Sequence, residues 1–368
     1  MRCCSRRPTG GYNEAVSTPA PWHPPATNPV LAVATRSERV ESWHRGAVVV
    51  VHEGEAMLSL GDVDAPVYAR SAIKPLQALP LLDGGARERL QLPAAELAVM
   101  CASHDGTDLH VAAVRSLLAR AGLDEERLGC GPHAPFARDA RLALLRTGQR
   151  PLKVHNNCSG KHAGFLHLAR ACGDDVAHYL EPACEAQRRV NTAVAEMVGL
   201  EGPLPHGVDG CGAPTLLLSL RALAAGFCRF ANHERLGPVR AGSCRAIFDA
   251  VGAAPVHLAG EQRFCTALAR QWPGRVFPKN GAEGVYVLAL RADPRRARAP
   301  GALGIAIKVD DGGERGYQPV VVDLLRWLGA FERDEVPDAL GRFARLPIAN
   351  TRQELVGAVH SVVHWERA

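Results

Sequence analysis

The sequence AVVVVHEGEAMLSL, residues 47–60, holds two apolar runs separated by a polar turn. The first run, residues 47–51, is almost entirely valine, a β-branched residue that favours strands. Glycine and charged residues between the runs, His52-Glu53-Gly54-Glu55, are typical of a turn. This stretch therefore predicts two antiparallel strands joined by a short connection.

Further strands are expected on both sides of this hairpin. The runs VLAVATR (30–36) and VYA (67–69) extend it into an antiparallel meander, with Gly61-Asp62 as a second turn. Strand patterns return near the other end of the chain, at 284–290, 302–309 and 355–363. Apolar residues recurring at helical spacing predict helices at 74–82, 94–102, 107–121, 161–171, 185–198, 215–226, 240–252, 262–271 and 319–332.

Strands at both ends with helices between them predict an α+β architecture. We expect an antiparallel sheet built from both termini, with a helical region inserted in the middle. The length of 368 residues suffices for a large core. Residues 1–29 are rich in Pro, Gly, Ser and Thr and predict a disordered leader. Residues 30–368 predict a single domain with two lobes.

Composition excludes several classes of protein. The net charge is only +5, and no basic block is interleaved with aromatics, so no nucleic acid partner is expected. The sequence contains no run of about 18 or more consecutive apolar residues, so no membrane span is expected. The eleven cysteines show no compact disulfide spacing. We therefore expect a reduced, cytoplasmic protein.

Lysine is scarce in this chain. Only five of the 43 basic residues are lysine, and the rest are arginine. Arginine does not lose its proton in proteins, whereas a buried lysine amine can act as a base or a metal ligand. Each lysine is therefore a candidate functional residue, although any one of them can also persist by chance. The five are Lys74, Lys153, Lys161, Lys279 and Lys308.

Ser71-Ala72-Ile73-Lys74 is an S-x-x-K motif at the start of a predicted helix, with Pro75 in the first turn. Spacing of three places the hydroxyl and the amine on one face of a helical turn. A serine hydroxyl becomes a good nucleophile when a neighbouring base takes its proton. Lysine can be that base if burial and nearby positive charge lower its pKa. The motif predicts a serine–lysine nucleophilic site.

Two later motifs strengthen this prediction. Ser103-His104-Asp105 follows a predicted helix, and Lys279-Asn280-Gly281 precedes a predicted strand. The order S-x-x-K, S-x-[ND], K-x-G is that of penicillin-recognising enzymes, in which the second serine and second lysine relay protons. The alternatives are a helix-end cap at Ser103 and a surface charge at Lys279. The ordered set favours the catalytic interpretation.

A dense polar run, His155 to His162, contains Cys158 and Lys161, again three residues apart. A second loop, 208–214, contains Asp209 and Cys211. Two thiolates can bind zinc, but zinc sites usually show C-x-x-C or histidine pairs. Spacing alone leaves both a metal site and two buried structural cysteines open.

At these residues the chain resembles the Rhizobium-type L-asparaginases, also called the asparaginase II or class 3 family. The resemblance covers residues 30–363. It rests on ARSAIKPLQALPLL (69–82), CASHDG (101–106), HNNCSGKHAGFL (155–166), VDGCGAPT (208–215), RFCTALA (263–269), KNGAEGVY (279–286) and GIAIKVDDG (304–312).

The resemblance implies a fold like that of serine β-lactamases and glutaminases, and a homodimer. It also implies hydrolysis of L-asparagine to L-aspartate and ammonia. Two serine–lysine tandems are implied, Ser71 with Lys74 and Ser103 with Lys279, with Ser71 as the nucleophile.

The resemblance further implies a zinc ion that helps to hold substrate and is not essential for the chemistry. Its ligands would be Cys158, Lys161 and Cys211, and Asp209 and Arg70 would help to bind substrate. A lysine ligand would explain why Lys161 is not arginine.

Some features depart from the family pattern, and two alternatives stay open. Cys184-Glu185 stands where the family usually has His-Pro, and Gln353 where glycine is common. The same chemistry on glutamine or on a β-lactam ring is one alternative. A non-catalytic zinc-binding relative is the other, and it would bind metal without hydrolysing amides.

Overall fold

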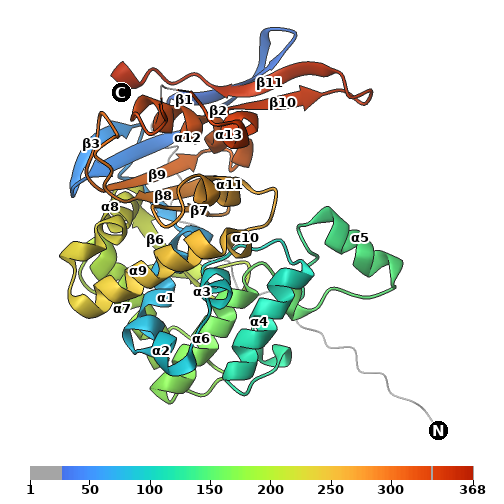
Figure 1. The fold of residues 1–368 in the computed structure, drawn as a ribbon, viewed down its shortest axis with the longest axis vertical. Coiled ribbons are helices and arrows are strands. Elements are labelled where there is room, and N and C mark those ends of the chain that lie inside the picture. Colours follow the sequence, from blue (N-terminus) through green and yellow to red (C-terminus); the bar gives the residue numbers. More distant parts are fainter. Residues whose placement is uncertain (1–26, 333–334, 368) are drawn as a thin grey trace, which may run out of the picture.

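The computed structural model describes residues 27–332 and 335–367 (Figure 1). Most of the predicted leader, residues 1–26, lies outside this part of the chain. Asn28, which the prediction places in the leader, is buried and donates a hydrogen bond to Asp310 at 2.9 Å. The folded domain therefore begins before Val30.

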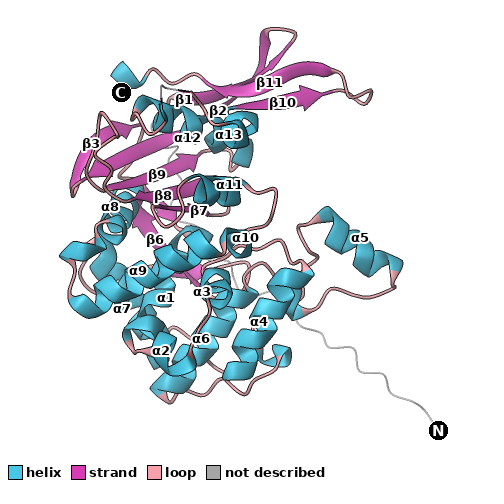
Figure 2. Cartoon of the chain, in the orientation of Figure 1, coloured by secondary structure: helices cyan, strands magenta, loops and turns pink. Residues whose placement is uncertain are grey.

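The main sheet has eight strands and combines both ends of the sequence, as predicted (Figure 2). Its order is β10-β11-β1-β2-β9-β8-β7, with β3 paired to β2, and every pairing is antiparallel. The α+β architecture is thus confirmed. The strands are β1 (Val30–Arg36), β2 (Arg39–His52), β3 (Glu55–Leu60), β7 (Val276–Asn280), β8 (Val285–Leu290), β9 (Leu303–Val309), β10 (Arg345–Ala349) and β11 (Leu355–Ser361).

The valine run that predicts the hairpin forms the centre of this sheet. Val48 and Val50 on β2 face Ile307 and Ile305 on β9, and all four are fully buried. Helix α8 (Leu220–Ala231) packs closely on β9 because Gly304 has no side chain. A Cβ atom there would lie 1.9 Å from a backbone oxygen of the helix.

A second, three-stranded sheet corrects two predictions. Its order is β4-β6-β5, with β4 (Pro66–Tyr68), β5 (His206–Val208) and β6 (Pro214–Ser219). The predicted meander therefore ends at β3, since β4 pairs with β6 instead. The helix predicted at 215–226 begins only at Leu220, because the apolar residues before it pair as strand β6. Ser219 then caps the helix through its hydroxyl.

Most of the other helices lie below the main sheet in Figure 1, whereas α11, α12 and α13 lie beside its strands. Most agree with the predicted segments, but α12 begins five residues earlier than expected, directly after a glycine pair, and α2, α5, α10 and α13 were not predicted. They are α1 (Lys74–Asp83), α2 (Ala86–Leu90), α3 (Ala94–Met100), α4 (Asp108–Arg120), α5 (Arg138–Arg146), α6 (Ser159–Cys172), α7 (Glu185–Val198), α9 (Pro238–Ala253), α10 (Pro255–Leu258), α11 (Phe264–Gln271), α12 (Glu314–Trp327) and α13 (Asp338–Ala344).

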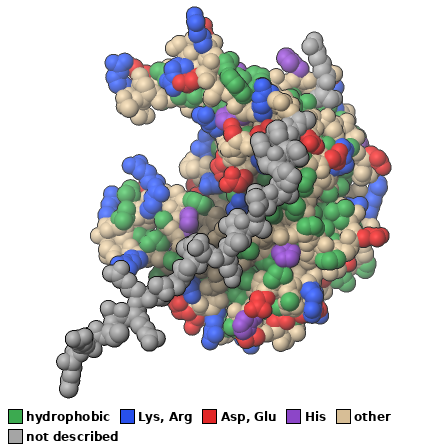
Figure 3. Space-filling view, turned by 180° about the vertical axis from the view of Figure 1, so that it is seen from behind, with side chains coloured by type: hydrophobic (Ala, Val, Ile, Leu, Met, Phe, Trp, Pro, Cys, Tyr) green, Lys and Arg blue, Asp and Glu red, His purple; other side chains and the backbone are tan. Residues whose placement is uncertain are grey.

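Two surface properties bear on possible partners. Among the described residues, no helix is both long and apolar enough to cross a membrane. On the face shown in Figure 3, acidic and basic side chains are interspersed over the visible surface.

Candidate active site

Ser103 lies in a buried loop between α3 and α4. Its side chain is almost inaccessible, with the residue only 3% exposed. The loop is fixed from one side by α10, because the Ser103 amide donates to Leu258 O at 3.1 Å and the Asp105 amide donates to Ala259 O at 2.7 Å. Gly106 has a positive φ of 71° and lies against His155 O, where a Cβ would be 2.9 Å away. A buried loop held this way gives Ser103 a defined position.

Lys74 is the first residue of α1, and its amine is surrounded by acceptors. The residue is 1% exposed. Its Nζ donates to Ala102 O at 2.5 Å and Ser103 Oγ at 3.2 Å. It also lies 3.5 Å from Asn157 O and 3.2 Å from Cys158 Sγ. The Lys74 amine thus joins the Ser103 loop to the segment that begins α6.

Lys279 reaches the same hydroxyl from the main sheet. It precedes strand β8 as predicted, but it lies itself within strand β7, which the sequence did not predict, and it is fully buried. Its Nζ lies 2.8 Å from Ser103 Oγ and 3.0 Å from Asn280 Oδ1. Burial, with help from the positive charge of Lys74, lowers the pKa of Lys279 to about 7. Its amine can therefore be neutral near pH 7, as a general base requires.

Ser71 lies apart from this three-residue contact. It belongs to a 3-10 turn, Arg70–Ile73, that precedes α1 and packs against β7. Within the described chain, its hydroxyl makes no hydrogen bond to Lys74. The sequence prediction pairs these two side chains, but the buried amine turns toward Ser103 and two backbone carbonyls. Ser71 is half-buried and so more accessible than Ser103.

Arg70 begins this turn in an unusual conformation. Its φ is +50°, in the left-handed region that non-glycine residues adopt at a cost of about 1–3 kcal/mol. Its Nε donates to Asp209 Oδ1 at 2.7 Å. Arg70 and Asp209, the two predicted substrate-binding residues, therefore form an ion pair, and Arg70 directly precedes Ser71 in the chain.

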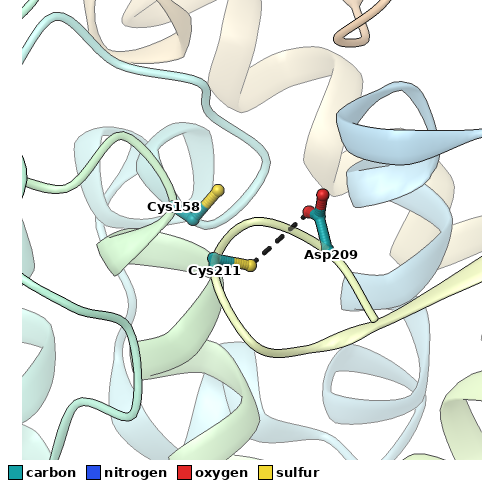
Figure 4. A group of neighbouring side chains, drawn as sticks. All are labelled: Cys158, Asp209 and Cys211. Atoms are coloured by element: carbon teal, nitrogen blue, oxygen red, sulfur yellow. Dashed lines mark hydrogen bonds between the residues drawn. The ribbon is translucent and has the colours of Figure 1, made fainter. Parts of the chain in front are cut away.

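The predicted zinc ligands also meet in space (Figure 4). Cys158 lies at the start of α6, and Asp209 and Cys211 lie in the loop between β5 and β6. One ligand atom from each of these three residues lies within 4.8 Å of the other two. Lys161 Nζ is 3.1 Å from Cys211 Sγ. All four predicted residues are thus neighbours.

Electrostatics at this cluster suit a cation. The hydrogen bond from Cys211, aided by Lys74 and Lys161, lowers the pKa of Cys158 well below its usual value, although burial opposes the shift. Burial acts to lower the pKa of Lys161, but the nearby Cys158 and Cys211 outweigh it and raise that pKa. These shifts favour opposite charges on Cys158 and Lys161. A metal ion bound here would displace the proton of the Lys161 amine and take the place of its positive charge beside the sulfurs. Two sulfurs, an amine and a nearby carboxylate fit zinc chemically.

Several partners in the site could not be read from the sequence. Ala102 O and Asn157 O bind the Lys74 amine through the backbone, which no side-chain motif reveals. The side chain of Asn280 accepts a hydrogen bond from Lys279, a role that the K-x-G motif does not assign to it. Its place directly after a candidate lysine was the one available signal.

Comparisons with known proteins agree with the motifs. A family model described as L-asparaginase II matches residues 32–361, nearly the whole chain. No curated protein matches the chain. Among solved structures, a β-lactamase from Sphaerobacter thermophilus is 15% identical, with 78% of this chain and 93% of that chain covered and a TM-score of 0.43.

Two further solved structures match the chain with similar sequence identity and TM-score. A Bacillus glutaminase is 12% identical, with 74% of this chain and 85% of that chain covered and a TM-score of 0.38. A structure described as Mglu in its native form is 16% identical with a TM-score of 0.40. The match covers 80% of this chain and 65% of the Mglu chain.

Proposed function

The chain belongs to the L-asparaginase II family of amidohydrolases, and from this premise we propose that it hydrolyses L-asparagine to L-aspartate and ammonia. One observation carries the mechanism: Ser103 Oγ lies within hydrogen-bonding distance of both the Lys74 and Lys279 amines. A hydroxyl between two buried amines is suited to passing protons between them.

Ser71 is the proposed nucleophile. It is the more accessible of the two serines and lies in the turn that leads directly into α1. Its oxygen would form a bond to the side-chain carbonyl carbon of asparagine, and the carbon–nitrogen bond would then break. Backbone N–H groups would stabilise the negative oxygen that develops. Lys74 is the proposed base for Ser71, which requires its amine to turn from Ser103 toward Ser71 when substrate binds.

Ser103 and Lys279 are proposed to carry the proton to the leaving group. The pKa of Lys279, about 7, allows its amine both to accept and to donate a proton near neutral pH. The proton would leave on ammonia, and a water molecule would then hydrolyse the ester on Ser71 to release aspartate. The close contacts of Ser103 also favour a second assignment, in which Ser103 itself attacks the amide.

Arg70 and Asp209 carry charges opposite to those of the substrate's α-carboxylate and α-ammonium groups. Asparagine carries an α-carboxylate and an α-ammonium, and the two side chains offer the opposite charges. A guanidinium binds carboxylates through paired hydrogen bonds, whereas a carboxylate accepts them from an ammonium. We propose that these residues bind the amino acid part of the substrate and leave its amide for the serines.

Cys158, Lys161 and Cys211 are the proposed zinc ligands. Bound zinc would supply a fixed positive charge that helps to hold substrate. The proton transfers above involve only Lys74, Lys279 and the two serines. Metal removal should therefore weaken substrate binding more than it slows the chemistry. A homodimer and a cytoplasmic location are further expectations from the family resemblance.

An ammonia-release assay tests this function. We expect release from asparagine to exceed release from glutamine, whose extra methylene costs about 1–3 kcal/mol if pocket fit alone decides. The assay is run with and without added zinc, and with a β-lactam as a third substrate. Zinc binding without hydrolysis of any amide would instead favour a non-catalytic zinc-binding protein.

A further inference from the structure

Lys74 is held by two separate segments of the chain. The Ser103 loop contributes Ala102 O and Ser103 Oγ, and the segment before α6 contributes Asn157 O and Cys158 Sγ. The amine keeps all these contacts only while the two segments stay together. A side chain that joins them would therefore set the geometry of the proposed proton relay without touching the substrate.

His104 is that side chain. It follows Ser103 directly and is fully buried. Its Nε2 lies 2.9 Å from Ser159 Oγ, on the first residue of α6. Its backbone amide donates to Asn157 O at 3.3 Å, the same carbonyl that lies near the Lys74 amine. Both the ring and the backbone of His104 thus bridge the two segments.

The hydrogen bonds fix which ring nitrogen carries the proton. The Gly106 amide can only donate, and it lies 3.2 Å from Nδ1, so Nδ1 is the acceptor. The neutral ring must then carry its hydrogen on Nε2 and donate it to Ser159 Oγ. Ser159 in turn donates to Val154 O at 2.9 Å. Burial lowers the pKa of His104 well below its usual value, and nearby His110 and Lys74 act in the same direction.

A second histidine provides a natural comparison. The ring of His110 stacks on His104 with centroids 5.1 Å apart, and it is also fully buried. Both its nitrogens are hydrogen-bonded, to Thr107 Oγ1 and Val256 O. Neither partner belongs to the segment before α6. The two imidazoles therefore share burial and bonding, but only His104 joins the two segments around Lys74.

We propose that His104 is a positioning residue, which holds Ser103 and Lys74 in register by tying the Ser103 loop to the first residue of α6. This inference rests on the proposed function for its kinetic consequence. It assigns His104 no proton transfer during the reaction. Its ring stays neutral and acts through Ser159 and the Asn157 carbonyl.

The test compares H104F, H104Q and H110F. Phenylalanine keeps the ring but removes both ring hydrogen bonds, whereas glutamine can still donate to Ser159. We expect H104F to lower kcat by roughly 10- to 100-fold with little change in KM, as expected for misplaced catalytic groups. H104Q should restore part of this loss. H110F, the matched control, should keep kcat within about threefold of the wild type while losing similar thermal stability.

Crystal structures of the same variants separate this inference from the proposed function. We expect H104F to move Ser103 Oγ beyond hydrogen-bonding distance of Lys74 Nζ, and H104Q to preserve the contact. The distance between Ser103 Oγ and Lys74 Nζ can be measured even if the wild type hydrolyses no amide. Absence of hydrolysis would contradict the proposed function but not the positioning role of His104. An unchanged Ser103–Lys74 contact in H104F would overturn the positioning role. Equal kcat losses in H104F and H110F would also overturn it.

Discussion

Ser103 Oγ lies 2.8 Å from Lys279 Nζ, and both residues are buried. These two residues are 176 positions apart and come from a loop in the helical half and from a strand of the main sheet. The proposed chemistry therefore depends on how the two halves of the fold pack together.

Turnover should depend on the protonation of Lys279. Its amine accepts a proton only when neutral, so kcat should rise about tenfold per pH unit below a pKa of about 7 and level off above it. Groups that influence this pKa are Lys74, Cys265, Cys158 and Arg263. A kcat profile over this range is the measurement. K279R is the control, because arginine keeps its proton and should be inactive throughout. A flat profile in the wild type would count against the role of Lys279.

The free energy of unfolding should also depend on the lowered pKa of Lys279. Between the folded value of about 7 and the ordinary value of 10.5, the unfolded chain binds a proton that the folded chain lacks. Stability conferred by this group therefore rises with pH across that window. Relative to K279M, the wild type should gain roughly 1.4 kcal/mol per pH unit there. Urea unfolding of both proteins at several pH values measures the difference, and a constant difference would show that the lysine pKa is not lowered.

Replacing either serine should reduce turnover by orders of magnitude. S71A removes the proposed nucleophile, and S103A removes the hydroxyl between the two amines. S243A is a matched control, since Ser243 is also buried but bonds to Asp83, outside this site. Mass spectrometry of enzyme quenched during turnover should find the aspartyl ester on Ser71. An ester on Ser103 would transfer the nucleophilic role to that residue.

Zinc binding should require the amine of Lys161. K161R keeps a positive charge near Cys211, but a guanidinium does not bind metal. We expect zinc affinity to fall by at least about tenfold. Elemental analysis and zinc titration measure this, with K153R as the control because Lys153 pairs with Glu126 outside the cluster. Unchanged zinc affinity in K161R would remove Lys161 from the ligand set.

Substrate affinity should depend on the ion pair between Arg70 and Asp209. D209N leaves the shape of the side chain but removes its charge, so KM for asparagine should rise by about tenfold or more, with a smaller change in kcat. Steady-state kinetics check this. E126Q, which alters an exposed carboxylate paired with Lys153, should leave KM unchanged. A D209N variant with wild-type KM would exclude Asp209 from substrate binding.

The sequence allowed the main elements of this fold to be predicted for identifiable reasons. The valine run and the helical spacing at α7 are local patterns, and α7 has the predicted bounds, whereas β2 contains the predicted run 47–51 but begins at Arg39. The apolar residues of β6 resemble a helix segment locally, and only pairing with β4 and β5 makes them a strand. Tertiary contacts decided that case.

The same limit applies to the site. The scarcity of lysine and the order of the motifs made Lys74, Ser103 and Lys279 candidates, whereas the resemblance to the family, not their spacing, implied Cys158, Lys161 and Cys211. The direction of the Lys74 amine could not be predicted, since it depends on backbone carbonyls of Ala102 and Asn157 from distant segments. The joining role of His104 was equally hidden, because it depends on contact with Ser159.

The most direct test measures ammonia release from L-asparagine by the wild type and K279R, at a pH above the Lys279 pKa and with zinc present. A neutral amine beside Ser103 predicts rapid release by the wild type and a loss of several orders of magnitude in K279R. Equal release by the two proteins would contradict the account, because a permanently charged guanidinium cannot accept the proton.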